Sequence, residues 1–199
     1  HAARTVAALE SYIGLVEAGV GLLPAGGGLK EIAERCARAA FTDDPFDQVR
    51  RYFETVAMAK ASTSALEAKQ LGYLRETDVV VFNANELLFV AKNVASSLAE
   101  SGWRPPLPQA THVAGDVGTA TIKAQLVNML AGHFISGHDM EIATRIADTL
   151  CGGNIERGST VDAQWLLDLE RKPANPPTAD YPLEWWDRII ATNLSSELY

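Results

Sequence analysis

Residues 12–28 read YIGLVEAGVGLLPAGGG, an apolar and glycine-rich segment with one carboxylate. Glu17 is the only charged residue between Glu10 and Lys30. Apolar surroundings disfavour the ionised form of a carboxyl group, so its pKa rises toward the range that is useful for proton transfer. The pattern makes Glu17 a candidate general acid or base, although a carboxylate that points into solvent at a strand end would give the same pattern.

Glycines surround this carboxylate. Gly14 lies three residues before Glu17, and a glycine lets another molecule approach the backbone so closely that its N–H can bind an oxyanion. Local backbone geometry is the other explanation for this glycine. Residues 24–28 are predicted to form a loop that either approaches a ligand or is a simple turn before a helix. Neither GxxxxGK[ST] nor GxGxxG is present, so the glycines alone do not indicate a phosphate site.

A second carboxylate, Glu54, lies on a predicted helix over residues 48–60, one position after Phe53. On pattern alone, the favoured explanation of this residue is a solvated helix face with a Glu54–Arg50 ion pair, worth about 0.2–0.5 kcal/mol.

The periodicity outside this region predicts an α/β chain that is rich in helices. Strands are predicted over 5–9, 11–15 and 78–82, and helices over 29–40, 48–60, 85–100, 119–134, 139–151 and 160–171. Ser64 and Glu67 have the spacing of a capping box for a short helix that ends near Gly72, and Ser159 with Asp162 is a candidate cap for the last helix. A proline-rich stretch begins at residue 173, so residues 172–199 are predicted to be a separate tail.

Composition narrows the classes of function. The chain has 199 residues, of which 47% are hydrophobic, so it can form a packed core. Its net charge of −8 and pI near 5.0 disfavour nucleic acid and membrane partners. No apolar run approaches the roughly 20 residues of a membrane helix.

Cysteine and histidine chemistry is limited. Cys36 and Cys151 form no CxxC pair, which excludes a disulfide scaffold and fits a reducing, cytoplasmic location. Cys36 is expected to be a small core residue. His112, His133 and His138 share no helical spacing with carboxylates, so no metal site is predicted.

Taken together, Gly14, Glu17 and the Pro-x-x-Gly-Gly loop resemble the crotonase (enoyl-CoA hydratase/isomerase) superfamily, in which these features follow one another. The segments FETV (53–56) and EAKQLGYL (67–74) are similar to the family's second catalytic helix and to the helix end that follows it. The resemblance runs from about residue 1 to about residue 171. In their detailed sequence, these motifs are most similar to the crotonase domain at the C-terminus of bacterial 3-hydroxyacyl-CoA dehydrogenase/enoyl-CoA hydratase fusions.

The resemblance implies a fold and a set of roles. Residues 1–171 would be the C-terminal portion of a crotonase-like ββα superhelix. Gly14 would be the second oxyanion-hole donor, and Glu17 and Glu54 the two catalytic glutamates. Glu17 would hold a water molecule together with Glu54, which would deliver the proton to C2. Because hydratases of this family keep both glutamates, the expected reaction is syn hydration of a 2-enoyl-CoA in fatty-acid β-oxidation.

The resemblance also implies what this portion lacks. The first oxyanion donor and most of the CoA-binding surface would lie before His1, so the chain alone is expected to hydrate crotonyl-CoA slowly or not at all. Acyl-CoA would be the substrate, no cofactor would bind here, and NAD would belong to the dehydrogenase domains. The expected partner is a second copy or the rest of the parent protein.

Two alternatives remain open. The chain could be a catalytically incomplete crotonase-like fragment that serves oligomerisation or docking. A nucleotide-binding oxidoreductase fragment is more distant, because residues 181–196 only weakly resemble a short-chain dehydrogenase segment and no nucleotide loop accompanies them. Titration with NAD would decide this second alternative.

Overall fold

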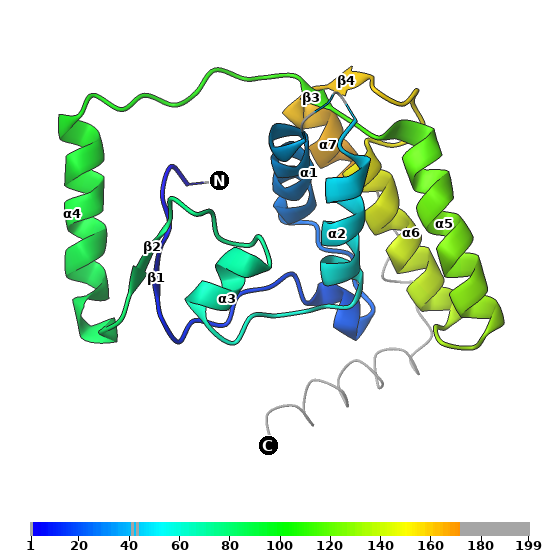
Figure 1. Cartoon of the computed structure of the whole chain (residues 1–199), viewed down its shortest axis with the longest axis horizontal. Coiled ribbons are helices and arrows are strands. Elements are labelled where there is room, and N and C mark those ends of the chain that lie inside the picture. Colours follow the sequence, from blue (N-terminus) through cyan, green and yellow to red (C-terminus); the bar gives the residue numbers. More distant parts are fainter. Residues whose placement is uncertain (1, 41, 43, 172–199) are drawn as a thin grey trace, which may run out of the picture. The chain divides into compact units, whose positions relative to one another are not determined.

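The computed structural model describes residues 2–40, 42 and 44–171 (Figure 1). The described residues form two compact units. Unit 1 comprises those of His1–Leu15 and Lys60–Gln109, and unit 2 comprises those of Val16–Ala59 and Ala110–Tyr199. Gly14 therefore belongs to unit 1, whereas Glu17 and Glu54 belong to unit 2.

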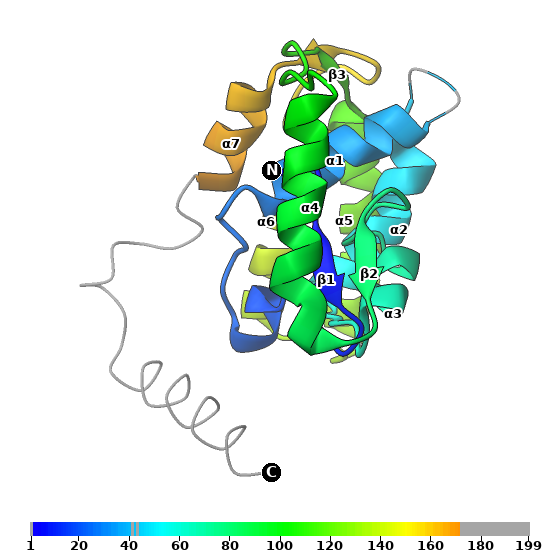
Figure 2. The same cartoon turned by 90° about the vertical axis from the view of Figure 1, so that its left-hand side faces the viewer.

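Unit 1 is built on a two-stranded parallel sheet. Strand β1 (Val6–Ala8) pairs with β2 (Val79–Val81), with Val6 opposite Val79. The long helix α4 (Leu87–Glu100) follows the short 3-10 turn η2 (Ala84–Glu86) and packs on β1 (Figure 2). Helix α3 (Ala65–Gln70) contributes to a small core, whose buried members are Ala7, Ala65, Ala68 and Leu74.

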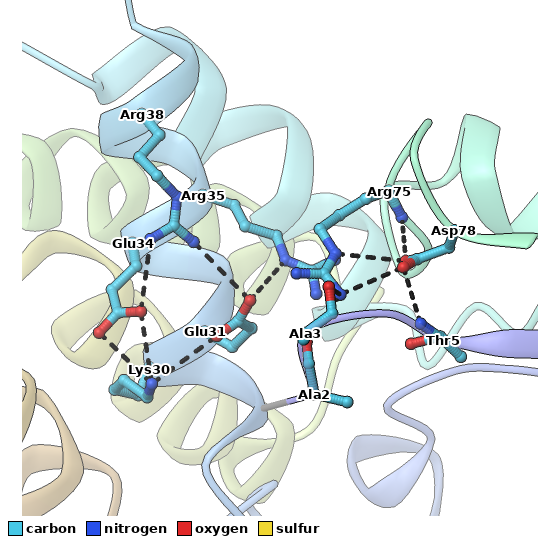
Figure 3. Close-up of polar contacts among 10 residues, drawn as sticks. All are labelled: Ala2, Ala3, Thr5, Lys30, Glu31, Glu34, Arg35, Arg38, Arg75 and Asp78. Atoms are coloured by element: carbon cyan, nitrogen blue, oxygen red, sulfur yellow. Dashed lines mark hydrogen bonds and ion pairs between the residues drawn. The ribbon is translucent and has the colours of Figure 1, made fainter. Parts of the chain in front are cut away.

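A buried carboxylate joins the starts of the two strands. Asp78 is 4% exposed and accepts hydrogen bonds from the backbone N–H groups of Thr5 (2.9 Å) and Arg75 (2.8 Å), and its partner Arg75 also donates to the Ala2 carbonyl (Figure 3). Burial alone would raise the pKa of Asp78, but the hydrogen bonds from Arg75 and Thr5 and the charge of Arg75 outweigh it and lower the pKa. The ionised form therefore stabilises the pairing of β1 with β2.

Unit 2 is a helical bundle around α6. Helix α6 (Gly137–Cys151) packs against α1 (Gly28–Ala39), α2 (Phe46–Ala57), α5 (Gly115–Ala131) and α7 (Ala163–Arg171). The 3-10 turn η1 (Glu17–Val20) lies against α2 and α6, and a short antiparallel pair joins β3 (Thr111–His112) to β4 (Thr160–Val161). The largest fully buried aliphatic side chains are Leu29, Val49, Val56, Val113, Ile122, Ile146, Leu150 and Leu166.

Both cysteines lie in this core. Cys36 and Cys151 have no exposed surface, and burial raises the pKa of each thiol to about 12. They are uncharged thiols at neutral pH, which confirms the prediction that Cys36 is a core residue.

Charged side chains of α1, most of them largely buried, form an ion-pair network (Figure 3). Glu31 pairs with Arg35 at 3.0 Å and with Arg38, and Glu34 pairs with Lys30 and Arg38. Burial would raise the pKa of Glu31, but the hydrogen bond from Arg35 and the charges of Arg35 and Lys30 lower it. These pairs at helical spacing support α1 without taking part in the core.

The helix-rich α/β class is confirmed, since the described residues form mainly helices together with one small parallel and one small antiparallel sheet, whereas the ββα superhelix stays a prediction. The predicted strand over 11–15 is wrong, because its pairing is reduced to a single bridge between Ile13 and Ser62. Helix α5 starts four residues before its predicted start at residue 119 and includes Gly118. A Cβ at Gly118 would lie 3.1 Å from Cys151 Sγ, so the glycine lets α5 approach α6 closely.

The caps follow the predicted residues with two exceptions, a change of partner for Glu67 and the predicted contribution of Ser159, which is wrong. Ser64 Oγ accepts from the Glu67 N–H, but the Glu67 carboxylate returns to the N–H of Thr63 instead of Ser64. Gly72 adopts the expected left-handed conformation after α3. Asp162 alone caps α7, by accepting from the Trp165 N–H. The predicted tail, residues 172–199, lies outside the described residues. Within the described part of the chain, no helix is both long and apolar enough to cross a bilayer.

A second buried carboxylate joins the last helix of unit 2 to the start of α1. Glu170, in the last turn of α7, has no exposed surface and accepts hydrogen bonds from the backbone N–H groups of Gly27 (2.8 Å), Leu29 (3.3 Å) and Lys30 (3.1 Å). The first N–H groups of a helix have no partner within the helix, and they carry the positive end of the helix dipole. Glu170 thus serves as the N-terminal cap of α1, although it comes from a distant part of the sequence.

We expect Glu170→Gln to lower the free energy of unfolding by about 1–3 kcal/mol. The amide nitrogen of glutamine cannot accept from an N–H, so at least one backbone donor of α1 loses its partner. Chemical denaturation followed by circular dichroism measures the loss. Asp168→Asn, an exposed change on the same helix, is the control, and equal stability of the two variants would contradict the capping role.

We expect the stabilising contribution of Asp78 to depend on pH. Because the folded-state pKa is lowered, the contribution is fully present above the unfolded-state pKa of about 3.9 and is lost as pH falls through the folded-state value. Asp78→Asn should therefore weaken the protection of the β1–β2 amides at pH 7, and its difference from wild type should shrink below pH 4. Hydrogen exchange measures this, with the exposed Glu76→Gln as control, and a difference that grows in acid would refute it.

Candidate functional site

Glu17 begins the 3-10 turn η1. The turn is closed by two backbone hydrogen bonds, from the Leu22 N–H to the Glu17 carbonyl (3.0 Å) and from the Gly21 N–H to the Ala18 carbonyl (3.1 Å). Gly21 ends the turn with φ +75°, a left-handed conformation that glycine adopts at no steric cost. A compact turn, and not a strand end, therefore presents Glu17.

The Glu17 side chain is half-buried, and its Oε2 atom is fully buried. Among the described residues, this oxygen has no hydrogen-bond partner. A buried polar atom without a partner costs free energy, and such atoms in native proteins occur at sites that bind water or a ligand. This property separates Glu17 from the capping carboxylates Asp78 and Glu170, whose hydrogen bonds are provided by the protein.

Glu54 lies on α2, which packs against η1 within unit 2. Its side chain is exposed, while the adjacent Phe53 is buried. The approach between the two elements is close near the end of α2, because a Cβ at Gly19 would lie 3.1 Å from the Cβ of Ala59. The structure thus brings together the two segments that carry the candidate glutamates, which are far apart in the sequence.

Gly14 belongs to unit 1, where packing requires a glycine. A Cβ at this position would lie 2.9 Å from the Ala61 Cα and 3.1 Å from the Lys60 carbonyl oxygen. Neighbouring Ile13 is held by Ser62, whose Oγ accepts from the Ile13 N–H and whose N–H donates to the Ile13 carbonyl. Packing therefore explains this glycine by itself, and its role as an oxyanion donor stays a prediction.

The glycine loop over 24–28 has a structural role. The Gly27 N–H donates to Glu170, so a carboxylate of the protein occupies the position that an anionic ligand would take at the start of α1. Of the two predicted explanations, the structure favours a turn that precedes a helix.

Sequence reasoning missed the contact of His138. This residue, in the first turn of α6, lies with its Nε2 atom 2.7 Å from the carbonyl oxygen of Gly21. The two residues are 117 positions apart, and no local pattern connects them. Across the described residues, no group of three or more His, Cys, Asp or Glu side chains has an arrangement that could hold a metal ion.

Unit 2 also contains a cavity of about 540 Å³ that is lined by residues of α5, α6 and α7. Lys123 and Asp148, which form an ion pair at 3.2 Å, are among its lining residues. Glu17 and Glu54 do not line this cavity, so it adds nothing to the candidate site.

Comparison with known proteins identifies one relevant relative. The chain is 43% identical over 171 residues to the probable 3-hydroxyacyl-CoA dehydrogenase of Bacillus subtilis (strain 168). The alignment covers 86% of this chain and 21% of that protein, so the chain spans about a fifth of the relative's length. Identity at this level shows that the chain is homologous to a part of it. No protein-family model and no solved structure gives a significant match.

We expect Gly14→Ala to destabilise unit 1 by about 1–3 kcal/mol, because the added methyl group meets the backbone of residues 60 and 61. Gly26→Ala is the matched control, since a Cβ at Gly26 has no neighbour within 4 Å. Chemical denaturation of both variants measures the difference. Equal stabilities would show that packing does not require the glycine at position 14.

Proposed function

We propose that the chain is part of an enoyl-CoA hydratase of the crotonase type, which adds water to a 2-enoyl-CoA thioester within a larger 3-hydroxyacyl-CoA dehydrogenase. One observation supports this proposal above the others. The turn η1, which presents Glu17 with a buried and unpartnered carboxylate oxygen, packs on the helix that carries Glu54. Two carboxyl groups that divide the roles of acid and base must lie near each other, and the packing of η1 against α2 supports such an arrangement of the two elements.

The proposed chemistry assigns a role to each of the three candidate residues. Water adds across the double bond, with its hydroxyl going to C3 and a proton to C2. Glu17 and Glu54 hold the water, and Glu17 accepts its proton while Glu54 delivers a proton to C2. Negative charge develops on the thioester carbonyl oxygen, where a backbone N–H donor stabilises it. In well-studied acyl-transfer enzymes, loss of one such donor costs about 10²–10³ in rate.

The proposed donor is the N–H of Gly14. In the described part of the chain, this N–H has no acceptor within hydrogen-bond distance, so it is available to a ligand.

The relative connects this reaction to a second one. Its name denotes oxidation of a 3-hydroxyacyl-CoA, and a 3-hydroxyacyl-CoA is the product of hydrating a 2-enoyl-CoA. Hydration and oxidation are consecutive steps of fatty-acid β-oxidation, so one polypeptide that carries both would pass the product from one site to the next. In this proposal the substrate of the chain is acyl-CoA, and NAD serves the dehydrogenase part.

A specific surface favours the alternative of a docking or oligomerisation module. No residue of α4 is buried, although the helix is largely apolar, and Leu88 is 82% exposed and Phe89 67% exposed. Exposed apolar patches of this kind mark contact sites between proteins or domains. Under this alternative the glutamates have no function, and α4 would be the functional surface.

We expect Glu17→Gln and Glu54→Gln each to lower the rate of crotonyl-CoA hydration by about 10²–10⁴ in the complete gene product. Glutamine keeps the size of the side chain but cannot exchange a proton at the required pKa. The rate is followed as loss of ultraviolet absorbance of the conjugated thioester. Glu10→Gln, an exposed carboxylate in unit 1, is the control.

Sedimentation analysis of two phenylalanine variants, combined with the rates of the glutamine variants, separates the two functions. The hydratase proposal fails if the glutamine variants retain the wild-type rate. Unchanged rates together with an association state that is abolished by Phe89→Glu, but not by Phe134→Glu at a still more exposed loop position, would establish the docking module instead.

A further inference from the structure

His138 is a partly buried residue that the proposed mechanism does not use. It follows the N-cap of α6, where Ser136 and Asp139 form a complete capping box. Its ring is only partly exposed, and its Nε2 atom lies 2.7 Å from the Gly21 carbonyl oxygen. A carbonyl oxygen can only accept, so Nε2 carries a proton and donates it.

The acceptor of this hydrogen bond belongs to the turn that presents Glu17. Gly21 is the residue that ends η1, and its N–H is bonded to Ala18 inside the same turn. The ring approaches so closely that a Cβ at Gly21 would lie 3.1 Å from Nε2. Glycine at this position is therefore needed twice, for its positive φ and for the approach of the imidazole.

The turn is held from two directions. On one side, Gly19 lies against Ala59 at the end of α2, and on the other, Gly21 is bonded to His138 of α6. Helix α6 also packs directly against α2. The hydrogen bond thus fixes η1 to the same rigid element that holds the helix of Glu54.

We propose that His138 is a positioning residue, which fixes η1 through the Gly21 carbonyl and thereby sets the place of the Glu17 carboxylate. This inference rests on the function proposed above. A displacement of about 1 Å in a catalytic group can cost about 10²-fold in rate. Loss of the His138–Gly21 hydrogen bond, which we call the tether, therefore affects catalysis although His138 itself does not touch the substrate.

The first experiment measures the tether without catalysis. The leucine of His138→Leu has a bulk comparable to that of histidine but cannot donate a hydrogen bond. The side-chain amide of His138→Gln can donate one. His133→Asn is the control, because His133 is exposed and has a positive φ that asparagine tolerates. Hydrogen exchange of the Gly21 and Leu22 amides, measured in the chain by NMR, should accelerate by about ten-fold in the leucine variant, recover in the glutamine variant and stay unchanged in the control.

The second experiment measures catalysis in the complete gene product. His138→Leu should lower kcat for crotonyl-CoA hydration by about 10²-fold with little change in KM, and His138→Gln should restore most of it. If His138→Leu does not fold, Gly21→Ala replaces it, since its methyl group pushes against the imidazole at the same hydrogen bond.

The outcomes are distinguishable. Unchanged amide exchange in the leucine variant overturns the tether. Faster exchange with an unchanged kcat overturns the positioning role, provided that Glu17→Gln is inactive in the same assay. If Glu17→Gln retains full activity, the proposed hydratase function fails, and the positioning role of His138 fails with it.

Discussion

The bundle of unit 2 depends on one buried carboxylate at the start of a helix. Glu170 accepts three backbone hydrogen bonds from the first turn of α1, so the charge is compensated by the N–H groups that α1 leaves unpaired. The interaction joins α7 to α1, and both helices pack on α6. It also fixes the residues directly before α1, which connect this helix to the turn of Glu17.

Close contacts explain the glycines of this segment better than a phosphate site does. Gly19 meets Ala59, Gly21 meets His138, and Gly27 meets Glu170, in each case at a distance that a larger side chain would obstruct or with a backbone conformation that it would strain. Each partner comes from a different element of unit 2. Residues 17–28 thus form a segment that contacts with several helices hold in place, and the candidate catalytic carboxylate of Glu17 lies at its first residue.

Much of the helix pattern could be predicted, because apolar stripes report directly which face of a helix is buried. The errors share a cause. Residues 11–15 have the composition of a strand, but only Ile13 finds a partner, so propensity without a neighbouring strand does not form a sheet. Helix α5 runs through Gly118, which local propensity disfavours, because close packing on Cys151 compensates for the weak helix former.

The sequence by itself determined the amphipathic helices, the buried Cys36 and an isolated carboxylate in an apolar segment, since these follow from composition and periodicity over a few turns. Only the tertiary structure decided that η1 packs against the helix of Glu54, that Glu17 keeps an unpartnered buried oxygen, and that His138 and Glu170 hold the glycine segment. Hydrogen bonds and close contacts between distant residues leave no local pattern, because each partner is selected by the packing of helices and not by its neighbours in the chain.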